Sequence, residues 1–336
     1  MIARMLATRL ALGLLTLAGV AVVVFVLLRV VPGDPVAMMI PPGATEADIA
    51  RLQARYGFDR SIAAQFLIWC GDLLTGEFGT SISLRQGVAG LILRHLPATL
   101  ELAVLALEIA VILGGAVAVI SARLRGRWAE NAIDTGNGLA LAVPDFIWAL
   151  AMVFLLGVLW PLLPISGRID PRLAPDYVSG FLLLESILRL DFAVAGDVFA
   201  HMLMPALALA LPLAAIIGRV LKSALVEAMS EDYALLARVK GFSEIAVILR
   251  EALRNALGPT LALTGVQFTF MLGGTVIVER IFSYPGLGNM AIDAVINRDL
   301  PLIQGLVLTF GAMFILINLA ADIGAVLLNP RLRHGG

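Results

Sequence analysis

The stretch Leu10–Leu28 reads LALGLLTLAGVAVVVFVLL and holds 19 consecutive residues without a charge, closed by Arg9 and Arg29. A helix of about 20 apolar residues spans the roughly 30 Å hydrocarbon core of a bilayer. Arg4 and Arg9 precede the stretch, as in a secretory signal. However, the apolar core is longer than that of a signal peptide, and Val30–Asp34 is no small-residue cleavage site. The sequence therefore predicts a retained transmembrane helix.

Long apolar stretches recur along the rest of the chain. Of its 336 residues, 60% are hydrophobic and only 15% are charged. A soluble domain of this length would lack the polar surface needed to face water. Five further candidate spans are Thr99–Ser121, Thr135–Leu163 (interrupted at Pro144 and Asp145), Met202–Gly218, Asn255–Val278 and Leu300–Ala321. We predict an all-α polytopic membrane protein with about six transmembrane helices, in contact with membrane lipid.

The composition excludes several function classes. A net charge of −1 argues against nucleic-acid binding, and the single cysteine excludes an intramolecular disulfide. Neither lysine follows a glycine, so no phosphate-binding loop is present. The three histidines do not fall at metal-ligand spacing, and no serine has an evident base partner. We expect no catalytic, cofactor-binding or metal-binding residues in this chain.

Arginine and lysine indicate the orientation of the spans. With six spans both termini lie on one side, together with residues 122–134 and 219–254. That side carries 13 Arg and Lys residues, against 5 on the other once residues 29–98 are set aside, because the rule is weak for long segments. We predict that both termini and residues 219–254 are cytoplasmic, with the protein in a bacterial inner membrane.

The predicted organisation has four parts. Residues 1–30 form an N-terminal transmembrane helix, and residues 31–98 form a periplasmic segment. Residues 99–328 form a transmembrane domain of five helices, and residues 329–336 form a cytoplasmic tail.

Amphipathic helices are predicted in the periplasmic parts. Thr45 can cap one helix. A second is indicated by the spacing of Ile62, Phe66, Trp69 and Leu73. A third, Val178–Leu190, is too short to span and places Glu185 one turn before Arg189. We expect these helices at the membrane interface or over a pore mouth.

The loop of residues 219–254 is the most structured of the predicted cytoplasmic segments. Good helix formers fill Arg219–Val239, Gly241 offers a left-handed stop, and Ser243 is a good N-cap for a second short helix. The pattern predicts a helix, a glycine turn and a second helix. A rigid projection of this kind transmits force better than a flexible loop, although a hairpin that only joins two spans would show the same pattern.

Polar residues in or near the spans are further candidates. The acidic ones are Glu101, Glu108, Asp145 and Glu279, all near predicted span ends, where exposure to the interface would satisfy them. Gln267 and Asn318 lie inside spans five and six. They can line a cavity or bond one helix to another, and helix bonding is the simpler interpretation.

Several segments resemble the permeases of ABC importers. In the loop these are Glu227-Ala228-Met229, Asp232-Tyr233, Ala237-Arg238, Lys240-Gly241-Phe242-Ser243 and Ala252-Leu253-Arg254-Asn255-Ala256, which match the "EAA" loop of that family. Elsewhere they include Pro32–Pro35, Phe78–Ser81, Leu96–Leu102, Pro164–Arg168, Glu279–Gly288, Arg298–Pro301 and Asn329–Arg333, which resemble the dipeptide, oligopeptide and nickel branch. Met229 departs from the alanine of the motif. The resemblance covers nearly the whole chain and is strongest to the first of the paired dipeptide permease subunits.

The resemblance implies a type I importer permease whose loop, about Leu235–Leu249, docks on a separate ATPase subunit. It implies that Glu227 supports the hairpin and that Gly241 makes its turn. The residues assigned to the ATPase-coupling loop are Glu227, Ala228, Tyr233, Ala237, Arg238, Lys240, Gly241, Phe242 and Ser243. The expected partners are a second homologous permease, two ATPase subunits that bind ATP and Mg²⁺, and a periplasmic binding protein. The expected action is alternating access.

Three alternatives stay open at this stage. A nickel or other small-solute importer belongs to the same family, although the long segment 164–201 favours peptides. An ion-coupled secondary transporter would need ionisable residues at the membrane midplane, and no span clearly has one. A membrane-bound enzyme would need catalytic clusters, which the sequence lacks.

Overall fold

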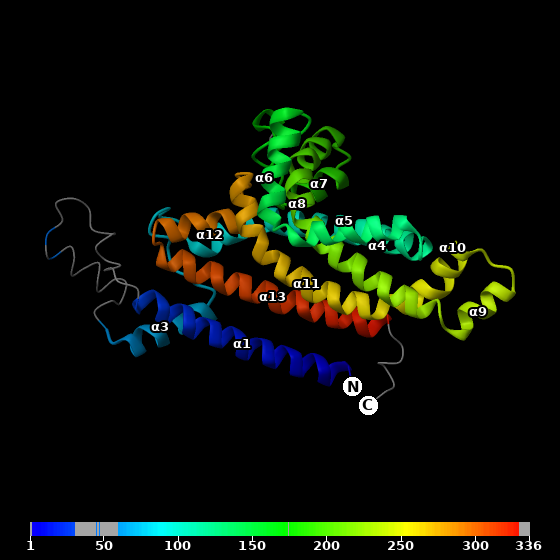
Figure 1. The fold of residues 1–336 in the computed structure, drawn as a ribbon. Helices are drawn as coiled ribbons and strands as arrows, with labels where there is room; N and C mark the ends of the chain where they lie inside the picture. Colours follow the sequence, from blue (N-terminus) through cyan, green and yellow to red (C-terminus); the bar gives the residue numbers. More distant parts are fainter. Residues whose placement is uncertain (1, 31–44, 46, 48–59, 174, 329–336) are drawn as a thin grey trace. The chain divides into compact units, whose positions relative to one another are not determined.

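The computed structural model describes every residue except 1, 31–44, 46, 48–59, 174 and 329–336 (Figure 1). The described residues form helices and a single isolated bridge between Thr80 and Gly87. The helices are α1 (Ile2–Val30), α3 (Ile62–Leu74), α4 (Val88–Arg123), α5 (Trp128–Ala142), α6 (Asp145–Met152), η1 (Val153–Leu159), η2 (Pro171–Leu173), α7 (Leu182–Leu188), α8 (Phe192–Ala228), α9 (Asp232–Val239), α10 (Glu244–Ala246), η3 (Val247–Ala252), α11 (Leu253–Ile281), α12 (Leu287–Ile296) and α13 (Leu300–Leu328). The predicted all-α fold is confirmed.

Five of these helices are long and apolar enough to cross a membrane, and a sixth span results if α5 and the α6–η1 helix count as one. The two halves of that sixth span meet at 99°. Pro144 explains the break, because a proline disfavours helical backbone in the residue before it, and Val143 is extended. The chain is a multi-pass membrane protein.

Two spans are longer than predicted. α4 has 36 residues and α8 has 37, which at 1.5 Å per residue exceed a core of about 30 Å. The fourth span is predicted as the short stretch Met202–Gly218, which contains Pro205 and Pro212. Both prolines lie inside α8, and membrane helices tolerate proline where neighbouring helices pack against them. α4 begins at Val88, so the predicted domain boundary between residues 98 and 99 falls within a helix.

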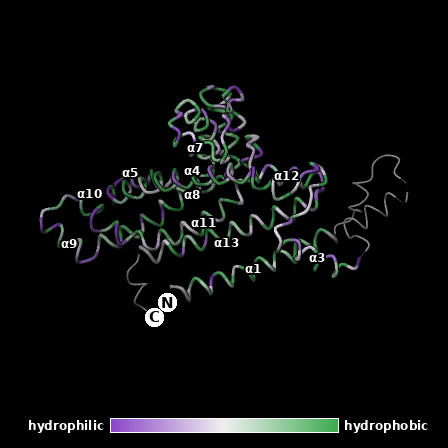
Figure 2. Tube along the Cα trace, turned by 180° about the vertical axis from the view of Figure 1, so that it is seen from behind, coloured by the Kyte–Doolittle hydropathy of each residue, from purple (hydrophilic) through white to green (hydrophobic). Residues whose placement is uncertain are grey.

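The chain divides into two compact units. The core unit comprises residues 1–6, 97–289 and 316–336, and the second unit comprises residues 7–96 and 290–315. In the core unit α8 is the central helix, because α5, α6, α7 and α11 all contact it. About two thirds of its most apolar stretch is buried, a larger share than in the other spans. Figure 2 shows long hydrophobic runs along the long helices and more hydrophilic residues around α9.

In the second unit α3 packs on α1. Phe66 and Trp69 contact Phe25, with ring centroids 5.2 and 5.4 Å apart. Ser61 caps α3 by accepting a hydrogen bond from the backbone N–H of Ala64. The predicted amphipathic helix is therefore confirmed, and part of its apolar face is covered by protein. The helix predicted to start at Thr45 lies outside the described residues.

The same unit joins two segments that the sequence analysis left without a role. The Asp299 carboxylate accepts hydrogen bonds from the hydroxyls of Ser81 (2.6 Å) and Ser83 (2.7 Å). Burial acts to raise the pKa of Asp299, but these hydrogen bonds outweigh it and lower that pKa. Asp299 also accepts from the Leu302 N–H in the first turn of α13. A single carboxylate thus connects Phe78–Ser81 to the start of the last span.

The helix predicted at Val178–Leu190 is shorter, running from Leu182 to Leu188 as α7. The predicted pair is present, with Arg189 Nη2 2.6 Å from Glu185 Oε1. Ser179 donates hydrogen bonds from its hydroxyl and its N–H to Glu185. These bonds, with that of Arg189, lower the pKa of Glu185 to about 2. The Ser179 contacts fold residues 178–181 back on α7 as a turn, which explains the late start of the helix.

Candidate functional site

The first candidate site is an elbow formed by residues 229–252. α8 ends at Ala228, α9 follows after three residues, and the chain turns at Lys240–Phe242 into α10 and η3. Gly241 has φ of +85°, the left-handed conformation predicted for it. In Figure 1 the elbow is the yellow-green segment joining α8 to α11. The predicted order of helix, glycine turn and helix is confirmed.

The predicted first helix, Arg219–Val239, is broken at Met229–Glu231. The Ser230 hydroxyl donates a 2.7 Å hydrogen bond to the Glu227 carbonyl and so satisfies an end group of α8. Asp232 then stands in the first turn of α9, where an acidic residue is favourable. The run Ser230-Glu231-Asp232 is typical of a helix start and could have indicated this break.

Arg238 holds the elbow in shape. Its guanidinium donates to both carboxylate oxygens of Glu244, at 2.8 and 3.3 Å, and to the Met229 carbonyl at 3.1 Å. The hydrogen bonds to Glu244 raise the pKa of Arg238. One side chain therefore links the end of α8, α9 and the start of α10. The sequence analysis assigned Arg238 to the coupling loop but did not predict this clamp.

The base of the elbow is packed into the helix bundle. Ile248 and Ala252 are fully buried with Leu225 of α8 and Ala122 of α4. A smaller cluster inside the elbow contains Ala234, Ala237 and Val247, with Tyr233 packed against it. Movement of the elbow must therefore move α8, α11 and the adjoining end of α4, because well-packed interiors transmit displacement.

The far side of the elbow exposes apolar side chains. Leu235, Leu236, Val239 and Phe242 are exposed on α9 and the turn after it, and Val239 reaches 78%. We call these four residues the elbow patch. Large apolar side chains gathered on a projecting, otherwise polar segment are typical of a protein-binding surface.

The residues predicted for the coupling loop all lie in or beside this elbow. Ala228 and Ala237 are buried, Tyr233 and Arg238 are partly buried, and Glu227, Lys240, Gly241, Phe242 and Ser243 are exposed.

Two details differ from expectation. The Glu227 side chain makes no hydrogen bond or ion pair with any described residue, so the supporting role that the resemblance implies for Glu227 stays a prediction, and the observed clamp is Arg238. Ser243 stands at the N-cap of α10 without a side-chain cap bond.

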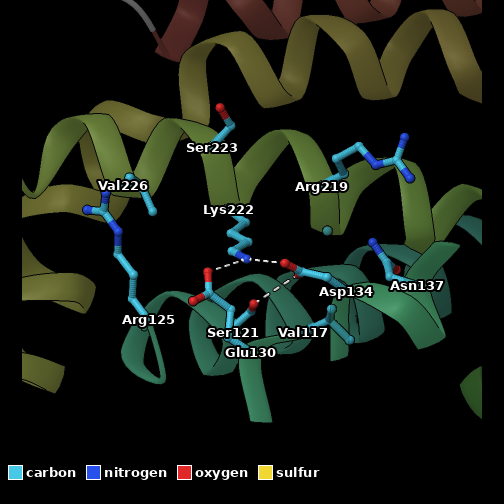
Figure 3. Close-up of a pocket in the computed structure, with 11 residues that line it drawn as sticks. Val117, Ser121, Arg125, Glu130, Asp134, Asn137, Arg219, Lys222, Ser223 and Val226 are labelled. Atoms are coloured by element: carbon cyan, nitrogen blue, oxygen red, sulfur yellow. Dashed lines mark hydrogen bonds and ion pairs between the residues drawn. The ribbon is translucent and has the colours of Figure 1, made fainter. Parts of the chain in front are cut away.

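A charged cavity of about 450 Å³ lies between α4, α5 and α8 (Figure 3). Lys222 points from α8 toward α5, where its ammonium is 2.7 Å from Glu130 and 2.5 Å from Asp134. Ser121 of α4 donates to Asp134 at 3.2 Å. The sequence analysis did not predict this cluster. Two signals were available: Lys222 is one of only two lysines in the chain, and Glu130 and Asp134 are four residues apart.

A second cavity, of about 230 Å³, lies at the bend of the broken span. Its polar lining consists of Asp145 and Gln267, and the remaining lining residues are apolar or proline. Gln267 therefore lines a cavity, which is one of the two roles predicted for it. Asn318 does not line either of these two cavities.

At the other end of α11 from the elbow, buried polar groups pair across helices. Glu279 is fully buried and accepts hydrogen bonds from the Thr99 hydroxyl (2.7 Å) and the Gly288 N–H (2.7 Å). Glu101 is buried and pairs with Arg168 at 2.6 Å. We call Thr99, Glu101, Arg168 and Glu279 the polar lock. Interface exposure was the expected explanation for Glu101 and Glu279, and it is wrong for both; Glu108 is exposed as expected.

Two family models match the chain. The model described as "Binding-protein-dependent transport system inner membrane component" matches residues 110–334, and the corresponding N-terminal model matches residues 1–103. The chain belongs to this family of permeases.

Curated relatives match over nearly the whole permease. The di/tripeptide transport system permease protein DppB of Pseudomonas aeruginosa is 36% identical over 330 residues, 98% of each chain. The dipeptide transport system permease protein DppB of Escherichia coli K12 is 36% identical over 333 residues, 97% of each chain. The resemblance inferred from the motifs is confirmed.

A solved structure supports the fold. An inward-facing MetNI methionine ABC transporter chain superposes with a TM-score of 0.54 at 15% identity, covering 71% of this permease and 96% of that chain. The permease therefore has the type I importer fold. Its family consists of transport subunits and not of enzymes.

Proposed function

We propose that this permease is a membrane subunit of an ATP-driven, binding-protein-dependent importer of dipeptides or oligopeptides, and that an ATPase subunit docks on the elbow patch. The observation that carries the proposal is the rigid elbow with exposed apolar residues. Arg238 fixes its shape, Ile248 anchors its base, and Leu236 and Val239 are exposed.

The proposed assembly contains four further subunits. A second, related permease completes the transmembrane pathway, two ATPase subunits bind ATP and Mg²⁺, and a periplasmic binding protein delivers the solute. The excess of Arg and Lys beside the termini and the elbow supports a cytoplasmic position for both, in the bacterial inner membrane. The ATPases would then meet the elbow on the cytoplasmic side.

The mechanism follows from how the elbow is attached. When ATP closes the two ATPases, each elbow is displaced together with its ATPase. Because Ile248 and Ala252 pack against Leu225, the displacement passes into α8 and α11 as a rigid-body movement. The pathway then opens toward the binding protein. ATP supplies energy only if the ATPase binds the elbow differently in the two states.

The proposed coupling loop keeps its predicted members, with different roles. Arg238 clamps the elbow, Gly241 makes the turn, and Phe242 belongs to the docking patch. Ala228 and Ala237 pack inside, together with Tyr233. Glu227, Lys240 and Ser243 are exposed, and we propose that they form polar contacts around the patch.

Peptide import is supported by the curated relatives, both of which are named as peptide permeases. The test is uptake of a labelled dipeptide by cells that have no other peptide importer and that express this permease with the subunits encoded beside it. Uptake that depends on ATP and on this permease supports the proposal. Uptake unchanged after deletion of the permease contradicts it.

Docking is tested separately with the elbow patch. Leu236→Asp places a charge in the patch without touching the clamp. We expect the variant to insert normally but to lose the co-purified ATPase subunit. Leu173→Asp is the control, because Leu173 is also exposed but lies in η2, outside both the membrane spans and the elbow. Equal ATPase recovery from the Leu236 variant and the wild type would refute docking at this surface.

A further inference from the structure

Asp145 is placed unusually for a carboxylate. It is the first residue of α6 and follows Pro144 at the bend of the broken span, so it lies at a break inside the span and not at either end of the span. It is partly buried and lines the 230 Å³ cavity. The other lining residues are Leu141, Val143, Pro144, Leu209, Pro212, Leu213, Ile216, Gln267, Phe270 and Met271.

Among the described residues, none forms an ion pair with this carboxylate. One oxygen accepts a 2.8 Å hydrogen bond from the Phe146 N–H, and no ion pair to a described residue is formed. By contrast, Glu101 pairs with Arg168, and Lys222 pairs with both acids of the charged cavity. An unpaired charge within a membrane span is unfavourable, and such residues mark solute or ion pathways.

Neighbouring residues leave room for this carboxylate. A Cβ at Gly274 of α11 would collide with Asp145 Oδ2, so a larger residue there would displace the acid. The volume of the cavity equals that of roughly eight waters at about 30 Å³ each. Such a space admits the end of a short peptide but not a whole folded segment.

We propose that Asp145 binds the cationic α-ammonium group of a peptide in transit. Gln267 lines the same cavity and carries both donors and an acceptor for the adjoining peptide amide. This inference rests on the proposed function, because it assumes that peptides pass this cavity. The peptide ammonium gives the Asp145 carboxylate a cationic partner, which no described residue provides. The hydrogen bond between them is charge-assisted and therefore stronger than a neutral one.

A purely structural role can be separated from binding. Asp145 accepts from Phe146 in the first turn of α6, and an asparagine side chain can accept the same hydrogen bond. Asp145→Asn therefore keeps the helix start and removes only the charge. Asp176→Asn is the matched control, since Asp176 is exposed and outside both cavities.

The experiment uses the complete importer reconstituted in proteoliposomes. We expect Asp145→Asn to lower the uptake of Ala-Ala, measured at saturating loaded binding protein, by about tenfold, as for loss of a charge-assisted hydrogen bond. Asp176→Asn should match the wild type. Uptake by Asp145→Asn equal to that of the wild type would overturn the inference.

A second readout reports binding directly on the permease. A hydrophobic carbodiimide should modify Asp145, as mass spectrometry would detect, and millimolar Ala-Ala should protect it while N-acetyl-Ala-Ala should not. Equal protection by both peptides, no protection by either, or no modification of Asp145 would each contradict the inference. If the wild-type importer takes up no Ala-Ala, the proposed function fails. If it does and only these tests fail, the role of Asp145 alone is wrong.

Discussion

The two ends of α11 are built differently. At its start the elbow is held by Arg238 and Glu244, whose contacts are local in sequence and partly exposed, and it presents an apolar patch. At its end the polar lock is buried, and its bonds join residues as far apart as Thr99 and Glu279. The apolar patch of the elbow is exposed and free to bind a partner, whereas the polar lock ties segments of the same chain together through buried polar bonds. We infer that the elbow transmits the movement of a partner into α8 and α11, and that the polar lock stabilises the fold.

The largest expected effect is loss of the buried ion pair. Arg168→Met leaves the Glu101 carboxylate buried without its cation, which should lower the free energy of unfolding by about 3–5 kcal/mol. The measurement is the melting temperature and yield of the solubilised permease. The double variant Arg168→Met/Glu101→Met removes both charges and should recover most of the loss. A double variant as unstable as the single one would show that packing, not the charge, matters.

A smaller effect is expected from Glu279→Gln. The amide keeps one acceptor for the Thr99 and Gly288 donors but turns an NH₂ group toward them, which should lower the unfolding free energy by about 1–3 kcal/mol. Glu108→Gln on α4 is the control and should have no effect, because Glu108 is exposed. Equal melting temperatures for the Glu279 variant and the wild type would show that the Glu279 carboxylate does not contribute to the stability of the polar lock.

The elbow should show the opposite pattern, with small effects on stability and large effects on uptake. Gly241→Pro cannot adopt φ of +85°, so the turn must rearrange and uptake should be lost. Gly241→Ala meets no neighbouring atom, so only backbone strain of about 1–2 kcal/mol opposes it, and part of the uptake should survive. Both variants should remain inserted. Normal uptake by Gly241→Pro would refute the coupling role of the turn.

The smallest expected effect concerns pH. Because the pKa of Glu185 falls from its ordinary 4.5 to about 2 in the folded chain, its ionised form stabilises the 178–189 turn above pH 4.5. That contribution is lost as the pH falls from 4.5 toward 2. Over that range the Ser179 and Val178 amides of the wild type should lose protection against hydrogen exchange, taken as the observed rate relative to the intrinsic rate at each pH. In Glu185→Gln the protection should be low throughout and show no such step; a step that persists would assign it to another group.

The sequence allowed prediction of features that depend on local chemistry. Uncharged runs located the spans, the spacing of Phe66 and Trp69 located α3, and Gly241 located the turn. The match to the loop motif placed the elbow among the family's coupling segments.

Features that depend on tertiary packing could not be predicted in this way. Proline inside a sequence is typical of a helix break, yet α8 continues through Pro205 and Pro212 at the centre of the core unit, packed against α5, α6, α7 and α11. The partner of Glu279 is Thr99, 180 residues away, so sequence spacing carries no information about the pair. Lys222 lacked a role until α5 brought two carboxylates to it.

The central claim is that the elbow patch is the surface on which an ATPase acts, and site-specific crosslinking tests it most directly. A photo-crosslinking amino acid is introduced at Val239 in the assembled importer, with the same substitution at Leu139 as control. We expect an adduct between the Val239 position and an ATPase subunit, and none from Leu139. An ATPase adduct that is absent at Val239, or equally strong at both positions, would show that the ATPase does not act on the elbow patch.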